Sequence, residues 1–302
     1  MMRSSPWLVL ALLVLAAPEA GAQQYQRTLV PGRFMCLVWN AREYVYRLDV
    51  AGSSRTPGDT EQAAIEAAFA TWRAASSTCS DYAFTRGPDI ENPQVGYVRD
   101  SKDNENVITF REVECGRAVP PDDECFLSDD CGNLYDCWEH GAATIGLTTT
   151  TFSFRTGYIL DADIEFNAAE GTGYLFTTVS SPPCEGGSLS PDCVATDLQN
   201  TVTHEVGHVV GLDHVSVPGS TMEPTAPLGE THKRLLDVGS VAGFCSAYPR
   251  GLPPTQCGEP ESIQREFLTV SQGPGVGCGA APGALLPAAL LGLLGFLRRK
   301  RA

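Results

Sequence analysis

The sequence predicts an α/β (α+β) domain. A mixed, twisted β-sheet should pack against a long helix and against a second helix that carries the candidate site, with a small C-terminal lobe. Three observations support this prediction. Several segments alternate hydrophobic and polar residues with the period of two that strands show. Two longer segments place hydrophobic residues at the spacing of amphipathic helices, and one of them contains closely spaced histidines.

The first elements follow from these periodicities. Strands are expected at residues 43–50, 107–110, 144–151 and 158–167. A helix is expected over residues 61–75, because Ile65, Ala68, Phe69 and Trp72 recur at the spacing of one helix face. We expect this stripe to pack against the sheet as part of the core rather than to bind a ligand.

A second helix is expected to begin after Thr196 or Asp197, since either side chain can cap a helix N-terminus. Its buried stripe should consist of four valines, at Val202, Val206, Val209 and Val210. The histidines lie on the opposite face, so the candidate site should lie on the side of this helix that faces away from the stripe.

The motif on this helix starts at His204 and reads H-E-V-G-H-V-V-G-L-D-H, which matches the zinc-site pattern H-E-x-x-H-x-x-G-x-x-H. His204 and His208 are one turn apart and can bind the same Zn²⁺. Glu205 can reach a metal-bound water as a general base. Gly211 tolerates the left-handed conformation that ends a helix, and this turn would bring His214 round as the third ligand.

A short H-E-x-x-H match also occurs on ordinary solvated helix faces. In this chain the longer pattern matches in register, and three of the five histidines fall inside it. The sequence therefore favours one catalytic zinc site over a solvated face.

Met222 follows His214 by eight residues, within the sequence S-T-M-E-P. A methionine in a tight turn at this distance is similar to the Met-turn of the metzincins. Together with the Asp213-His214 pair, it resembles the form found in the matrixins, in particular their minimal bacterial members. The resemblance extends, with looser motifs, over about residues 36–250.

This resemblance implies a metzincin-type zinc protease domain that hydrolyses peptide bonds in proteins or peptides. His204, His208 and His214 would bind the single catalytic zinc. Glu205 would act as the general base, and Met222 would form a hydrophobic floor beneath the metal. The alternatives are a surface-anchored binding protein with an inactive zinc site and a zinc amidase that acts on cell-wall peptides. The intact Glu205 argues against an inactive site, because metal binding alone does not need that carboxylate.

The sequence departs from the larger matrixins in two respects. Their second, structural zinc uses additional histidines, whereas only His140 and His232 remain here, so no second zinc of that kind is expected. Their N-terminal cysteine switch has no counterpart, and Cys36 is expected to form a disulfide with a partner such as Cys79. We therefore expect the chain that starts at Gln23 to be active without further N-terminal trimming.

Eleven cysteines indicate export to an oxidising compartment. Six of them form two groups, Cys115, Cys125, Cys131 and Cys137 in the first and Cys184 and Cys193 in the second. The first group lacks C-x-x-C pairs, which favours disulfides over a cysteine zinc site. Ten cysteines precede Cys278, which leaves Cys278 as the odd one.

The strand expected at residues 158–167 alternates hydrophobic side chains with Asp161, Asp163 and Glu165. One face should therefore be buried and the other polar. We expect the acidic face to be solvated. A Ca²⁺ site is the alternative interpretation, because Ca²⁺ prefers oxygen ligands.

The ends of the chain predict export. Residues 1–22 have the basic start, short hydrophobic run and A-x-A site of a signal peptide, followed by a catalytic domain over 23–250. Residues 251–277 are Pro/Gly-rich and are expected to form a linker. Residues 278–302 contain a cysteine, a hydrophobic span and a basic cluster, and resemble myxobacterial-type sorting tails. We expect a cell-surface or extracellular location, with membrane attachment through this tail that is transient if the tail is cleaved.

The domain between these ends is strongly acidic. Without the five basic residues at the two ends and Glu19, 16 basic and 35 acidic residues remain, a net charge of −19. Such a charge argues against nucleic-acid binding and favours a soluble, monomeric domain.

Overall fold

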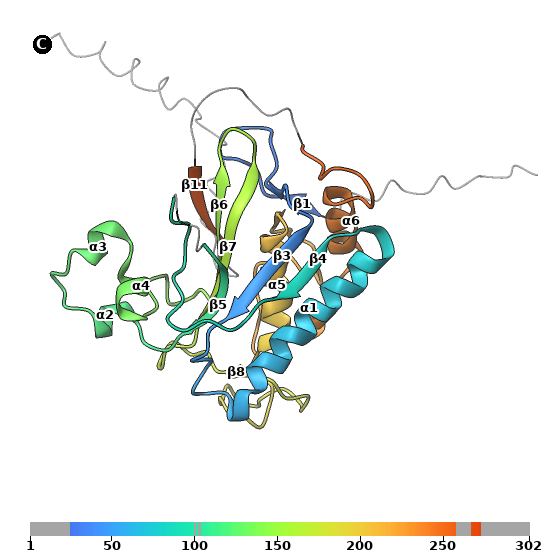
Figure 1. Cartoon of the computed structure of the whole chain (residues 1–302). Helices are drawn as coiled ribbons and strands as arrows, with labels where there is room; N and C mark the ends of the chain where they lie inside the picture. The colour runs from blue at the N-terminus through green and yellow to red at the C-terminus, as the bar shows by residue number, and fades with distance from the viewer. Residues whose placement is uncertain (1–24, 100, 102–103, 258–266, 273–302) are drawn as a thin grey trace, which may run out of the picture.

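The protein folds around one mixed β-sheet, which the computed structural model describes within residues 25–99, 101, 104–257 and 267–272 (Figure 1). The strands of this sheet are β2 (Val38–Trp39), β3 (Glu43–Leu48), β4 (Ala83–Arg86), β5 (Asn106–Arg111), β6 (Gly146–Ser153), β7 (Tyr158–Asn167) and β11 (Phe267–Gln272). Their order is β11-β6-β7-β5-β3-β4, with β2 beside β7. The pairs among β2, β3, β4, β5 and β7 are parallel, whereas β6 pairs antiparallel with both β7 and β11. The predicted mixed α/β fold is confirmed.

The remaining elements are helices and two small sheets. The helices are α1 (Thr60–Cys79), α2 (Cys115–Ala118), α3 (Cys125–Ser128), α4 (Cys131–Tyr135), α5 (Leu198–Val209) and α6 (Val238–Ala247), with 3₁₀ turns η1 (Pro57–Asp59) and η2 (His232–Arg234). In the small sheets, β1 (Gln26–Arg27) pairs with β10 (Leu212–Asp213), and β8 (Phe176–Thr177) pairs with β9 (Thr196–Asp197). The predicted strands and both predicted helices are present, with ends that differ by a few residues.

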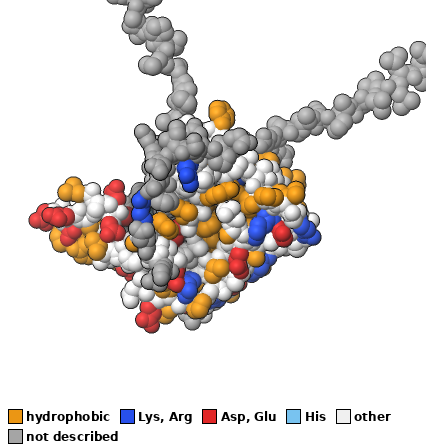
Figure 2. All heavy atoms as spheres, turned by 45° about the horizontal axis from the view of Figure 1, so that its top comes forward, with side chains coloured by type: hydrophobic (Ala, Val, Ile, Leu, Met, Phe, Trp, Pro, Cys, Tyr) orange, Lys and Arg blue, Asp and Glu red, His pale blue; other side chains and the backbone are white. Residues whose placement is uncertain are grey.

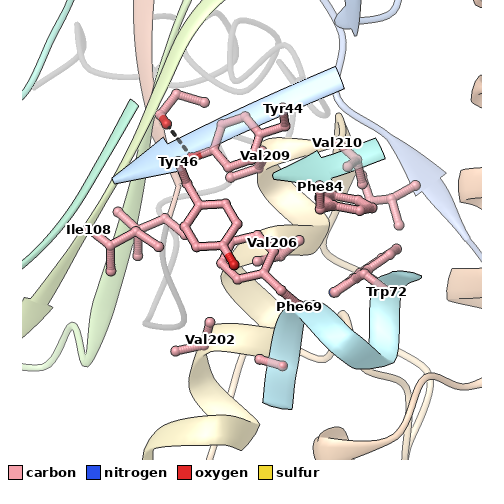
Figure 3. Close-up of a cluster of buried hydrophobic side chains, with 14 of the residues drawn as sticks. Tyr44, Tyr46, Phe69, Trp72, Phe84, Ile108, Val202, Val206, Val209 and Val210 are labelled. Atoms are coloured by element: carbon pink, nitrogen blue, oxygen red, sulfur yellow. Dashed lines mark hydrogen bonds between the residues drawn. The ribbon is translucent and has the colours of Figure 1, made fainter. Parts of the chain in front are cut away.

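The hydrophobic core lies between the sheet and the two long helices, α1 and α5 (Figure 3). Phe69 on α1 stacks on Tyr46 of β3 with 3.7 Å between ring centroids. The Trp72 indole N–H donates to the carbonyl of Thr203 at 3.0 Å and so joins the two helices directly. The stripes predicted on both helices are buried here, which confirms their interpretation as core. Burial of each such large side chain stabilises the fold by about 1.5–3 kcal/mol.

The acidic face of β7 is buried, so the prediction of a solvated strand surface is wrong. Asp161, Asp163 and Glu165 are at most 4% exposed. Asp163 accepts hydrogen bonds from the backbone N–H groups of Gly96 at 2.6 Å and Val107 at 2.8 Å. Alternation in the sequence showed that this face is polar, but it could not show that a distant loop covers it.

Glu165 is neutralised within this buried face. Its carboxylate accepts from Nε of the buried Arg111 at 2.7 Å and lies 3.4 Å from Nε2 of His140. Asp161 keeps one buried oxygen for which the described residues supply no partner. Calcium binding on this strand stays a prediction.

We predict that the buried pair Asp161 and Asp163 makes stability depend on pH. Burial raises the pKa of Asp161 to about 6, and burial together with the Asp161 charge raises the pKa of Asp163 well above its usual value. The folded state therefore keeps protons that the unfolded chain loses above about pH 4, so the stability from this pair falls as pH rises through about 4 to 6. Asp161→Asn should flatten this dependence and add on the order of 1–3 kcal/mol to the free energy of unfolding at pH 8.

Urea unfolding of both proteins between pH 4 and pH 8 measures this effect. Asp122→Asn, on an exposed carboxylate, is the matched control and should follow the parent curve. An Asp161→Asn curve parallel to that of the parent would contradict the prediction.

Five disulfides pair all ten cysteines that precede Cys278. The predicted Cys36–Cys79 pair is wrong, because Cys36 bonds to Cys257 and Cys79, at the end of α1, bonds to Cys245 on α6. Helix α6 is therefore bonded to the end of α1, and Cys36 instead holds the segment that follows α6.

A disulfide-rich lobe projects from the sheet at the left of Figures 1 and 2. It contains α2, α3 and α4 and is held by the Cys115–Cys137 and Cys125–Cys131 disulfides, so the prediction of disulfides over a cysteine zinc site is confirmed. Acidic and hydrophobic side chains lie together on its surface (Figure 2). Phe126, Leu127 and Leu134 are among its exposed hydrophobic residues.

The stretch expected as a linker contains more structure than its composition indicated. Cys257 is disulfide-bonded, Thr255 N–H donates to the Ala247 carbonyl at 2.8 Å, and Phe267–Gln272 forms strand β11. Residues 1–22 and 278–302, expected as a signal peptide and a sorting tail, lie outside the described residues. Within the described part of the chain, no helix has the length and hydrophobicity that a membrane span requires.

Candidate metal centre

Three histidines converge at the end of helix α5. The Nε2 atoms of His204, His208 and His214 lie 3.1 to 3.2 Å from one another. His204 and His208 are buried on one face of α5, as their spacing predicts. Gly211 has a φ of +83°, so the helix ends in the predicted left-handed turn and the chain returns with His214. Among the described residues, this triad is the one group of three residues whose ligand atoms could share a metal.

Backbone carbonyls fix the orientation of two of these rings. Nδ1 of His204 lies 2.6 Å from the carbonyl oxygen of Thr221, and Nδ1 of His208 lies 2.9 Å from that of Leu212. Each Nδ1 must carry the proton of this bond, since a carbonyl only accepts. The Nε2 lone pairs of both rings therefore point toward the centre of the triad.

The triad fits a bound metal ion. Nitrogen lone pairs that face one another at this distance repel unless a cation lies between them. Tetrahedral zinc, with Zn–N distances of about 2.0–2.1 Å, places its nitrogen ligands about 3.3 Å apart, close to the separation seen here. Burial, followed by repulsion from the neighbouring His208, lowers the pKa of His204, and burial also lowers that of His214. Both shifts favour the neutral imidazole that binds metals.

Glu205 lies beside the triad and is fully buried. Its Oε2 accepts a hydrogen bond of 2.7 Å from the Thr148 hydroxyl, whereas its Oε1 has no partner among the described residues. Burial raises the pKa of Glu205 to about 8. A buried carboxylate with one oxygen available is suited to exchange a proton with a reacting group.

Met222 packs against α5 next to this site. A Cβ atom at Gly207 would overlap the Met222 sulfur, so the glycine between the motif histidines allows the close approach. Met222 is buried in the predicted tight turn, in which the Glu223 N–H donates to the Ser220 carbonyl at 3.2 Å. The Met222 carbonyl accepts from the Val215 N–H at 3.0 Å, which joins this turn to the residue after His214.

Several residues that support the site carry no readable signal in the sequence. Asp237 caps α6 and accepts a hydrogen bond of 2.8 Å from the N–H of Thr221, whose carbonyl holds His204. Near the N-terminus, Thr28 N–H donates to the Gly211 carbonyl at 2.9 Å and its hydroxyl donates to the Leu212 carbonyl at 3.1 Å. These contacts fix the turn that carries His214, and they join segments that are far apart in the chain.

The mixed sheet, the H-E-x-x-H helix and the histidine triad define a metallopeptidase type of domain. The family model described as Matrixin matches residues 38–248, which is more than half of the chain, and the chain therefore belongs to the matrixin family. Matrixins bind zinc, and the triad is the group that fits this metal.

One curated relative supports the same class. The chain is 42% identical over 55 residues to "Metalloendoproteinase 4-MMP" of Arabidopsis thaliana. The matched stretch covers 18% of this chain and 16% of the relative, so the chain spans less than a fifth of the length of that protein.

Proposed function

We propose that this protein is a zinc-dependent endopeptidase that hydrolyses peptide bonds in proteins. The observation that supports this proposal best is the position of Glu205 beside three convergent imidazoles, buried, with one carboxylate oxygen available. A structural metal site needs the histidines but has no use for such a carboxylate. Family membership and the metalloendoproteinase relative support the same activity.

The residues of the site have distinct roles in this proposal. His204, His208 and His214 would hold the zinc, which would supply a Lewis acid for the scissile carbonyl and for the attacking water. Oε1 of Glu205 takes the proton of that water and later donates it to the leaving amine. Thr148 keeps the carboxylate in place through the hydrogen bond to Oε2.

We predict one bound zinc per chain and a complete dependence of proteolysis on it. The protein that starts at Gln23 should hydrolyse casein without N-terminal trimming, lose this activity in a chelator and regain it when zinc is added. Elemental analysis of the active preparation measures the zinc directly. An active preparation that contains no zinc would refute the proposal. Hydrolysis of peptidoglycan peptides without hydrolysis of casein would identify the amidase alternative.

We further propose that the protein is exported and that its C-terminal segment attaches it to a membrane before cleavage near Cys278. The sequence of both ends, the five disulfides and the acidic surface support export. We predict mature ends at Gln23 and near Cys278 when the protein is recovered from its native host. Mass spectrometry of the termini measures both. A chain that still ends at Ala302 with an unmodified Cys278 would contradict cleavage and would indicate that the C-terminal segment is a permanent membrane anchor.

A further inference from the structure

Strand β6 has its inner edge in the sheet and its outer edge covered by the chain's own C-terminal segment. The inner edge pairs with β7, and the outer edge pairs with β11 in an antiparallel register of six residue pairs. Figure 1 shows β11 alongside β6 at the border of the sheet. No other strand within the described residues pairs with that outer edge.

β6 also borders the candidate site. The hydroxyl of Thr148 on this strand donates to Oε2 of Glu205 at 2.7 Å and lies 3.2 Å from the backbone carbonyl oxygen of Glu205. A Cβ atom at Gly146 would lie 3.2 Å from Oε1 of Glu205, so the start of β6 passes directly beside the available carboxylate oxygen. An extended chain on the outer edge of β6 therefore runs toward this site.

We infer that Phe267–Gln272, which pairs with the outer edge of β6, acts as an internal competitor of an extended peptide substrate. This inference rests on the proposed endopeptidase function. Main-chain hydrogen bonds along a free sheet edge bind extended peptides with little dependence on their sequence. A peptidase must bind its substrate as an extended chain near the catalytic groups, and β6 is the strand that provides such an edge beside Glu205.

The register gives the direction of the bound chain. Phe267 lies opposite Ser153 and Gln272 lies opposite Thr148, the residue that holds Glu205. A peptide bound in the same direction has its C-terminal end nearest Gly146 and Oε1 of Glu205. A substrate that pairs with this edge of β6 therefore cannot bind while Phe267–Gln272 occupies it.

A disulfide shortens the tether of this competitor, which belongs to the same chain. Cys257 is bonded to Cys36, so the chain is fastened to the domain ten residues before Phe267. A short tether of this kind gives an effective concentration in the millimolar range. The segment therefore stays a reversible competitor at any protein concentration, which raises KM for peptide substrates and leaves kcat unchanged.

The test uses the full mature chain with a site-specific protease cleavage sequence inserted between Cys257 and Phe267. The protein is folded intact, cut and diluted, so that β11 is no longer tethered. A second variant carries the same cleavage sequence between Gln272 and Cys278, where the cut leaves β11 attached. The first cut should lower KM for a peptide substrate by about three- to tenfold, the ratio expected when a millimolar effective concentration acts on a segment whose own dissociation constant is about 0.1–0.5 mM. The second cut should leave KM unchanged.

Two measurements that need no catalysis complete the test. Amide hydrogen exchange at residues 148–153 should increase after the first cut only. A labelled peptide of the sequence FLTVSQ should bind the protein cut before Phe267 and should not bind the protein cut after Gln272. Unchanged KM, unchanged exchange or equal peptide binding to both forms would overturn the inference. If no form hydrolyses peptides while exchange and binding change as expected, the edge is a binding surface and the proposed function fails separately.

Discussion

Glu205→Ala is expected to keep one zinc per chain and to lose about 10²–10⁴-fold in kcat for a peptide substrate, the range attributed to general acid–base catalysis. The carboxylate is a neighbour of the histidine triad and not one of its members, since its Oε2 bonds to Thr148 and its Oε1 has no partner among the described residues. Its loss should therefore remove proton transfer and spare the metal. Steady-state kinetics and elemental analysis of the same preparation measure both quantities.

His208→Ala is the matched comparison for this variant. It removes one of the three convergent imidazoles, so zinc content and activity should fall together. Circular dichroism should show that both variants keep the fold, because the core between the sheet and the helices does not depend on these two side chains. Near-normal turnover in Glu205→Ala would remove the proposed mechanism, and loss of zinc from it would make the carboxylate a ligand.

The candidate site was predictable because its elements are local in sequence. The spacing of His204 and His208, the glycine turn and the return of His214 are all consequences of helix geometry within eleven residues. The two amphipathic helices and the alternating strands follow from the same kind of local periodicity. The hydrophobic pattern predicts that these side chains are buried. Which side chains touch, such as Phe69 and Tyr46, depends on the three-dimensional fold.

The parts that could not be predicted are long-range. Nothing near Cys36 indicates Cys257 as its partner, because the pair depends on the path of the chain after helix α6. The polar face of β7 was recognised, but its cover comes from Gly96 and from Arg111, at other places in the chain. Strand β11 lies in a stretch whose composition predicts a linker, and it becomes a strand by pairing with the edge of β6.

The turn after helix α5 should be the backbone position most sensitive to substitution near the site. Gly211 has a φ of +83°, and a Cβ atom there would overlap the backbone carbonyl of Leu37. Gly219 has a similar φ of +80°, but a Cβ atom there would meet nothing within 4 Å. Substitution of either glycine by a residue with a side chain therefore costs about 1–2 kcal/mol for the left-handed conformation. Only substitution of Gly211 adds a steric overlap.

Gly211→Ala should consequently lower the free energy of unfolding by about 3–5 kcal/mol, because overlap with a rigid backbone group adds to the conformational cost. It should also weaken zinc binding, since relief of the overlap must move the turn that carries His214. Gly219→Ala should cost about 1–2 kcal/mol and leave zinc affinity unchanged. Denaturant unfolding of the zinc-free proteins and competition for zinc with a chelator measure the two effects. Equal destabilisation by both substitutions, or unchanged zinc affinity in Gly211→Ala, would show that contact with Leu37 does not hold the third histidine in place.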